Sequence, residues 1–208
     1  MVEIKVGRYT IIDGISGSSK ETQGGLLSSW LIKKGYDVLE IHEPYDARVK
    51  KSLKEIKNAG IDNPYADAAI FTFDRLALSY EKIFPAIREG KTVISLRGFT
   101  STLAVQSGET FSMEFLRTVN SFVPQPDLIY ILDVPAEVGF ARVQNRSVGT
   151  WEGERGIWET KLKEMERMRR NFLQLQNYLT NVEIVDANRT KEQVHEHMRK
   201  VWVRKFES

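Results

Sequence analysis

Short apolar runs alternate with longer segments of helical period along the whole chain, and this alternation constrains the fold more than any other feature. Five runs read as buried strands because they are rich in β-branched residues and show little polar alternation; they cover residues 9–13, 37–41, 92–96, 127–133 and 182–185. The spacing of apolar residues predicts helices over residues 22–34, 66–89, 112–122, 136–144, 159–178 and 191–206. Such strand–helix alternation predicts an α/β fold with a parallel sheet and right-handed crossovers.

The chain is long enough for one domain with a large core and short for two. It has 208 residues, of which 41% are apolar and 28% charged, and we find no linker, repeat or break in composition. We therefore expect a single domain over residues 1–208. No apolar run approaches the ~20 residues that span a bilayer, and the N-terminal residues lack the apolar segment of a secretory signal. We expect a cytoplasmic protein without membrane contact.

The content of charged residues and cysteine excludes several kinds of chemistry. There is no cysteine, which excludes disulfides, thiolate zinc sites and a cysteine nucleophile. The net charge of +2, from 30 basic and 28 acidic residues, gives no electrostatic footprint for nucleic acid. A basic cluster at Arg167, Arg169 and Arg170 lies among helix formers, and we expect it to be a solvated helix face.

A glycine-rich loop follows the first predicted strand. The segment DGISGSSKETQ, residues 13–23, lies between that strand and a helical pattern. A bound polyphosphate needs converging main-chain N–H groups, close approach of the chain, a helix N-terminus and a cation. Gly14 and Gly17 supply the room, Lys20 supplies the charge, and a helix beginning near Lys20 supplies the dipole. The loop therefore predicts phosphate binding.

The loop matches the pattern G-x-x-x-x-G-K-[ST] incompletely. Ser19 stands at the second glycine, where a positive φ would cost on the order of 1 kcal/mol, and Glu21 stands at the magnesium-binding hydroxyl. The alternative is a plain strand-to-helix turn that contains a lysine. Gly24 and Gly25, inside the following helix, each cost roughly 1 kcal/mol against alanine and suggest close packing of this helix on the sheet.

Further motifs carry a resemblance to a known family. They are TIIDGISGSSKETQ (10–23), HEP (42–44), FTFDR (71–75), AIREGKTVISLRGFTSTLAVQSG (86–108), PDLIYILDVPAEVGFARVQNR (126–146) and VDANRTKEQVHEHM (185–198). In order and spacing they resemble the thymidylate kinase family over nearly the whole chain. The resemblance implies a three-layer P-loop kinase fold with a five-stranded parallel sheet flanked by helices, and a small lid near residues 143–158. It also implies a homodimer that uses ATP and Mg²⁺ to phosphorylate dTMP or a related pyrimidine nucleotide.

The resemblance assigns roles to individual residues. The donor phosphates would lie against Gly14, Ile15, Ser16, Gly17, Ser18, Ser19, Lys20, Glu21, Thr22 and Arg146. The acceptor nucleotide would lie against Asp13, Glu43, Phe71, Arg75, Arg97, Ser101 and Gln106. The catalytic cations would be Lys20, Arg97 and Arg142, with Arg155 a further candidate in the lid. Phe71 would stack on the acceptor base, and Arg75, one helical turn later, would reach the polar groups of that base.

Each of these roles has a structural alternative. Phe71 could belong to the core, and Asp74 and Arg75 could form a surface pair of little energetic weight. Arg142 and Arg146 could lie on a solvated helix face, and Ser101 and Gln106 could be polar loop residues.

The sequence also departs from the family pattern. Ser16 replaces an acid, Leu96 replaces the carboxylate that ends the third strand, and Val105 replaces a tyrosine. The sequence assigns no metal ligands. Asp13, Glu21 and Glu43 are the acids that remain near the expected phosphates, and any of them could organise Mg²⁺ through water. Three functions stay open: an active nucleoside monophosphate kinase, a catalytically impaired nucleotide-binding protein of the same fold, and a kinase with an altered acceptor.

Overall fold

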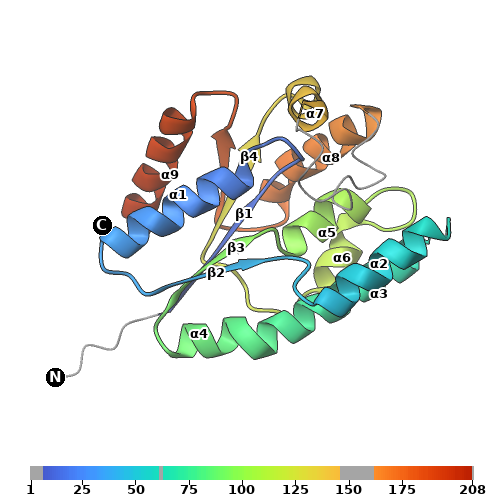
Figure 1. The fold of residues 1–208 in the computed structure, drawn as a ribbon, viewed down its shortest axis with the longest axis horizontal. Coiled ribbons are helices and arrows are strands. Elements are labelled where there is room, and N and C mark those ends of the chain that lie inside the picture. The colour runs from blue at the N-terminus through green and yellow to red at the C-terminus, as the bar shows by residue number, and fades with distance from the viewer. Residues whose placement is uncertain (1–6, 61–62, 146–161, 208) are drawn as a thin grey trace.

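The computed structural model describes residues 7–60, 63–145 and 162–207. At its centre is a parallel five-stranded sheet in the order β2-β3-β1-β4-β5 (Figure 1). The strands are β1 (Arg8–Asp13), β2 (Val38–His42), β3 (Thr92–Leu96), β4 (Leu128–Asp133) and β5 (Val182–Asp186). Each strand begins and ends within one residue of its predicted range, so the predicted α/β sheet is confirmed.

Helices cover both faces of the sheet, giving three layers (Figure 1). On one face, α1 (Lys20–Lys33) and α9 (Lys191–Phe206) pack against each other and on the strands. On the other face, α4 (Phe84–Arg88) contacts β3, α8 (Leu162–Gln174) contacts β4, and α5 (Phe99–Gln106) packs along α8. Two apolar cores result, one on each face of the sheet.

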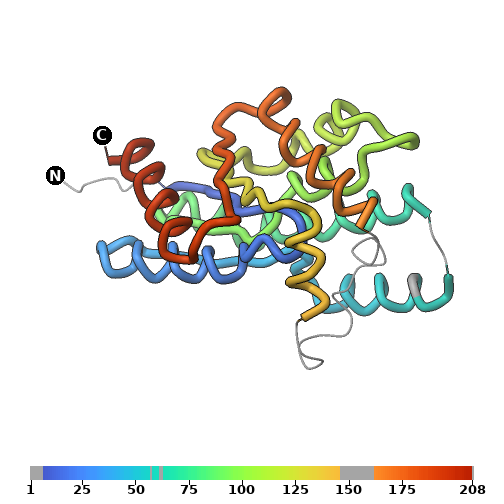
Figure 2. The backbone as a smooth tube through the Cα atoms, turned by 90° about the horizontal axis from the view of Figure 1, so that it is seen from above, coloured from blue at the N-terminus to red at the C-terminus, as the bar shows by residue number. Residues whose placement is uncertain are grey.

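Further helices and two short turns complete the described part of the chain. They are α2 (Ala47–Asn58), α3 (Pro64–Leu78), α6 (Met113–Val119) and α7 (Ala136–Gln144), with a π-helical turn η1 (Ser79–Ile83) and a 3₁₀ turn η3 (Leu175–Asn177). In both views α2 and α3 run beside each other and extend beyond the sheet (Figures 1 and 2). No helix in the described part of the chain is long and apolar enough to span a bilayer.

Two helices were not predicted, α2 and α5. Helix α2 is strongly charged, and among its described side chains only Val49 and Leu53 are buried. The second is short and rich in threonine and other weak helix formers, so it depends on burial of Phe99 and Leu103.

The apolar stripe expected over residues 66–89 is also not continuous. Phe73 and Tyr80 are 60% and 65% exposed, whereas Ile83 is buried. The wider π-helical turn begins at Ser79 and changes which side of the helix faces the core between Tyr80 and Ile83, whereas Phe73 is exposed on the regular helix α3 before it.

Candidate active site

The loop from β1 to α1 lies at the carboxyl end of the central strand. Gly14 has φ 147° and Gly17 has φ 78°. A Cβ atom on Gly14 would lie 2.6 Å from the carbonyl oxygen of Leu132, and one on Gly17 would lie 2.4 Å from that of Gly139. Both positions therefore require glycine. Ser19 adopts the left-handed conformation with φ 68° and ψ 26°, which confirms the strained position expected at the missing glycine.

Lys20 is the first residue of α1, and its side chain is buried against the loop. Its Nζ atom lies 3.4 Å from the carbonyl oxygen of Ile15 and 3.8 Å from the carboxylate of Glu21. The hydroxyl of Ser18 is buried without a hydrogen-bond partner in the described part of the chain. A helix N-terminus, an ammonium group and an unsatisfied hydroxyl on one loop fit a phosphate chain.

Asp13 joins this loop to α5. Its fully buried carboxylate accepts hydrogen bonds from the main-chain N–H of Gly14 (2.9 Å) and from the hydroxyls of Thr100 (2.6 Å) and Ser101 (2.7 Å). Thus Asp13 and Ser101, both predicted on the acceptor side, contact each other. Thr100 was missed, although its place beside Ser101 in the run Thr-Ser-Thr was a usable signal.

A buried ion pair lies beside α5. Arg75 Nε and Nη2 donate to Glu43 Oε2 at 3.0 and 2.7 Å, and Nη1 donates to Asn120 Oδ1 at 2.7 Å. Nη2 also lies 3.2 Å from the carbonyl oxygen of Gly98. Burial raises the pKa of Glu43, and the guanidinium of Arg75 opposes this rise. Asn120 was missed, because only the fold brings residues 45 positions apart into contact.

The surface-pair alternative for Asp74 and Arg75 is wrong, since both side chains are buried. The carboxylate of Asp74 instead accepts the main-chain N–H groups of Tyr45 and Asp46, each at 2.7 Å, just before α2. Phe71 lies one turn before Arg75 on α3 and is half-buried.

Arg97 follows β3 directly, in a left-handed conformation with φ 72°. This conformation costs roughly 1–2 kcal/mol for a residue with a side chain, and strained residues of this kind cluster at functional sites. The main-chain N–H of Arg97 donates to Ile12 on β1 at 3.0 Å. Within the described residues its guanidinium makes no hydrogen bond or ion pair, so this cation remains available to a ligand.

Two further predicted residues border the loop and α5. Arg142 on α7 donates through Nη1 to the carbonyl oxygen of Gly17 at 3.0 Å, so it is bound to the loop and is not on a solvated face. Gln106 ends α5, and its side-chain oxygen is buried without a partner among the described residues. Arg146, Arg155 and most of the expected lid lie outside the described residues.

The residues present do not fit a protein-held magnesium shell of the usual P-loop kind. Leu96, at the strand end where a carboxylate would lie, is 5% exposed and packs on Gly24 of α1. Glu21 takes the hydroxyl position on the loop, with a side chain that is 42% exposed. Over residues 7–60, 63–145 and 162–207, no three acidic or histidine side chains are grouped as metal ligands.

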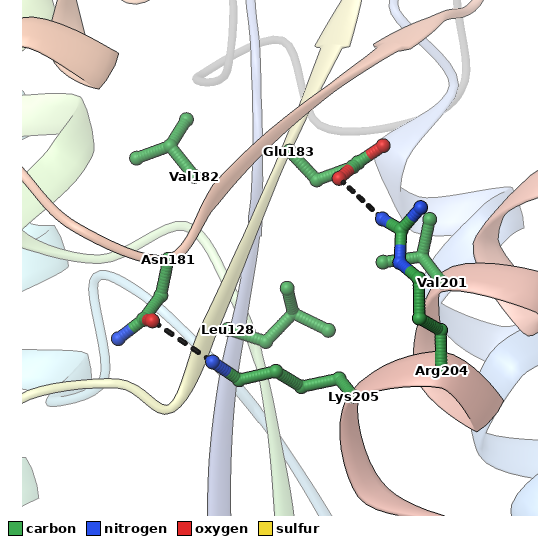
Figure 3. Close-up of a pocket in the computed structure, with 7 residues that line it drawn as sticks. All are labelled: Leu128, Asn181, Val182, Glu183, Val201, Arg204 and Lys205. Atoms are coloured by element: carbon green, nitrogen blue, oxygen red, sulfur yellow. Dashed lines mark hydrogen bonds and ion pairs between the residues drawn. The ribbon is translucent and has the colours of Figure 1, made fainter. Parts of the chain in front are cut away.

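A separate shallow pocket of about 200 Å³ lies at the opposite edge of the sheet, where β4 and β5 begin (Figure 3). Glu183 pairs with Arg204 at 3.0 Å and Asn181 with Lys205 at 2.9 Å on its rim. These polar groups therefore satisfy one another. The pocket contains none of the predicted site residues.

Comparison with known proteins places the chain in a family. The family model described as thymidylate kinase matches residues 12–198. A probable thymidylate kinase of Pyrococcus abyssi is 35% identical over 196 residues, covering 91% of this chain and 93% of that protein. A second, from Pyrococcus horikoshii, is 36% identical over 196 residues, covering 91% and 92%. A third, from Thermococcus gammatolerans, is 33% identical over 199 residues, covering 91% and 93%. With the loop, the sheet order and Arg97 at the end of β3, these matches show that the chain belongs to the thymidylate kinase family.

Proposed function

We propose that this protein is a nucleoside monophosphate kinase that transfers a phosphoryl group from ATP to dTMP or a closely related pyrimidine nucleotide. Family membership supports this proposal. One structural observation carries it. Arg97 lies at the end of β3, the strand next to the one that leads into the glycine-rich loop, in a strained left-handed conformation, and its guanidinium has no partner within the described residues. Phosphoryl transfer depends mainly on positioning and positive charge, which such a residue supplies.

On the donor side, the loop from Gly14 to Thr22 would hold the phosphates of ATP, with Lys20 as the cation. Arg142 fixes the loop through its bond to the carbonyl oxygen of Gly17. Mg²⁺ is proposed to arrive with ATP, because this chain has Leu96 where a carboxylate would organise the ion. The donor role of Arg146, and a lid over residues 143–158 within a single domain 1–208, remain part of the proposal.

On the acceptor side, the nucleotide would lie between α3 and α5. Phe71 is proposed to stack on the base, and Arg97 to bind the phosphate that receives the transferred group. Arg75 has five N–H groups, and its Nη1 atom uses one hydrogen on Asn120, so the other Nη1 hydrogen can serve the base. Gln106 brings a buried oxygen that lacks a donor in the described part of the chain. Asp13, Glu43 and Ser101 are proposed to shape this side through the bonds described above.

A coupled assay of ADP release tests the proposal. ATP with Mg²⁺ is supplied together with dTMP, dUMP, dCMP or a modified pyrimidine nucleotide, and Lys20→Ala serves as the inactive control. We expect turnover with at least one acceptor and its loss in the control. Absence of turnover above background with every acceptor would remove the kinase function. Calorimetric titration with ATP and dTMP would then tell a nucleotide-binding protein from a protein that binds neither.

We also propose that the protein forms a homodimer through helices beside the acceptor side. Large apolar side chains are exposed there: Tyr65 (64%), Phe73 (60%) and Tyr80 (65%) on α3 and η1, and Phe115 (50%) on α6. The rings of Tyr65 and Phe115 both contact the ring of Phe111, and exposed aromatic groups of this kind favour a protein interface over a solvated surface.

A further inference from the structure

The carboxyl end of α5 lacks the usual main-chain cap. The last four carbonyl groups of a helix have no partner within that helix. Ser107, which follows α5, is extended with φ −70° and ψ 139°, so the chain leaves the helix without a left-handed turn. The carbonyl oxygens at this end are buried against α8 and need donors from elsewhere.

Side chains of α8 supply these donors. Arg167 Nη1 donates to the carbonyl oxygen of Ser107 at 2.7 Å, and Nη2 donates to that of Val105 at 3.0 Å. Asn171, one turn later, donates through Nδ2 to the carbonyl oxygen of Ala104 at 2.9 Å. Two side chains of one helix therefore cap another, and the positive guanidinium lies at the negative end of the α5 dipole.

The expectation of a solvated basic face is therefore wrong for Arg167 and Arg169. Arg167 is also held by Glu164, 2.9 Å from its Nε atom, and Arg169 forms a bidentate pair with Asp133 at 2.7 and 2.9 Å. Arg170 alone of the three is exposed. Arg167 meets the end of α5 and Arg169 meets Asp133 at the end of β4, and only the tertiary structure shows these two contacts.

The other end of α5 is tied to the candidate site. Thr100 and Ser101 donate to Asp13 on β1, and Arg75 donates to the carbonyl oxygen of Gly98. Arg97 lies just before α5, and Gln106 is its last residue. Residues of the candidate site therefore bind one end of this helix, and side chains of α8 bind the other end. An eight-residue helix has little stability of its own, so its placement depends on both attachments.

From this geometry we infer that Arg167 and Asn171 are positioning residues, which cap α5 from α8 and so hold the acceptor side of the site in place. Neither is expected to contact nucleotide. The inference rests on the proposed kinase function for its kinetic consequence, whereas the cap itself is independent of any activity.

Two measurements test this inference on the variants Arg167→Met and Asn171→Leu, with Arg170→Met as the matched control. All are made at a temperature at which circular dichroism shows each variant to be folded. Hydrogen exchange of peptides covering residues 99–108 is expected to quicken at least about tenfold in Arg167→Met, because that variant loses both charged hydrogen bonds to the end of α5. Arg170→Met should match the wild type, and Arg167→Lys should lie between them because an ammonium reaches one carbonyl group. Unchanged exchange in residues 99–108, or equal quickening over the whole chain, would overturn the inference.

The kinetic measurement varies dTMP and ATP separately. Arg167→Met and Asn171→Leu should raise KM for dTMP about tenfold while KM for ATP stays within about twofold. An equal rise in both KM values would indicate a general structural role and count against the inference. If the wild type has no turnover with any of the pyrimidine nucleotides named above, the proposed function fails, and hydrogen exchange still decides whether the cap exists.

Discussion

The contact between Gly24 and Leu96 gives a sharp prediction for stability. A Cβ atom placed on Gly24 would lie 2.3 Å from Leu96 Cδ2, whereas one on Gly25, the next residue of α1, meets nothing within 4 Å. Glycine to alanine inside a helix normally stabilises by about 1 kcal/mol. At Gly24 this gain is opposed by overpacking, which costs typically about 1–3 kcal/mol.

We therefore expect Gly25→Ala to stabilise the protein by about 1 kcal/mol, and Gly24→Ala to be neutral or to destabilise it by up to about 2 kcal/mol. For a chain of this size the difference corresponds to about 2–4 °C in Tm per kcal/mol, which thermal unfolding followed by circular dichroism resolves. In a Leu96→Ala background the clash disappears, so Gly24→Ala should then stabilise as Gly25→Ala does.

The double-mutant cycle thus predicts a coupling of about 1–3 kcal/mol between positions 24 and 96 and none between 25 and 96. If Gly24→Ala raises Tm as much as Gly25→Ala in the wild-type background, then the side chain of Leu96 does not pack against Gly24. The explanation of how this chain fills the place of the missing carboxylate would then be wrong.

Three other predictions concern side chains outside the Gly24–Leu96 contact or the charge at Leu96. Burial, with Arg199 nearby, lowers the pKa of His195; the unfolded chain therefore binds that proton more readily, and stability falls as pH drops below about 6.5. His195→Asn should lessen this fall in urea titrations between pH 7 and 5, and an unchanged slope would contradict it. The double variant Phe73→Ser, Tyr80→Ser should be monomeric by light scattering where the wild type is dimeric, and a variant that stays dimeric would contradict an interface through α3 and η1. Leu96→Asp places a carboxylate among apolar side chains and should lower the free energy of unfolding by several kcal/mol, of which about 2–5 kcal/mol comes from the lost leucine alone. An unchanged Tm would argue against the burial of Leu96.

Much of the fold could be predicted because its signals are local. The strand boundaries follow from β-branched runs buried on both faces, and the loop from Gly14 to Lys20 follows from the needs of a turn between strand and helix. Even the strain at Ser19 could be anticipated, since its position relative to Lys20 marked where a glycine would stand. By contrast, α5 has weak local signals, because its stability comes from neighbours distant in the sequence.

What the sequence by itself determined is the parallel sheet, the glycine-rich loop and the family, because their signals are short local motifs and the order of those motifs along the chain. Only the tertiary structure decided which polar groups face one another: Arg75 with Asn120, Asp13 with Thr100, and Arg167 with the end of α5. It also placed Leu96 over Gly24, which explains one of the two helix glycines. The physical reason is that buried donors and acceptors must be paired, and their partners lie wherever the packing of distant elements brings them.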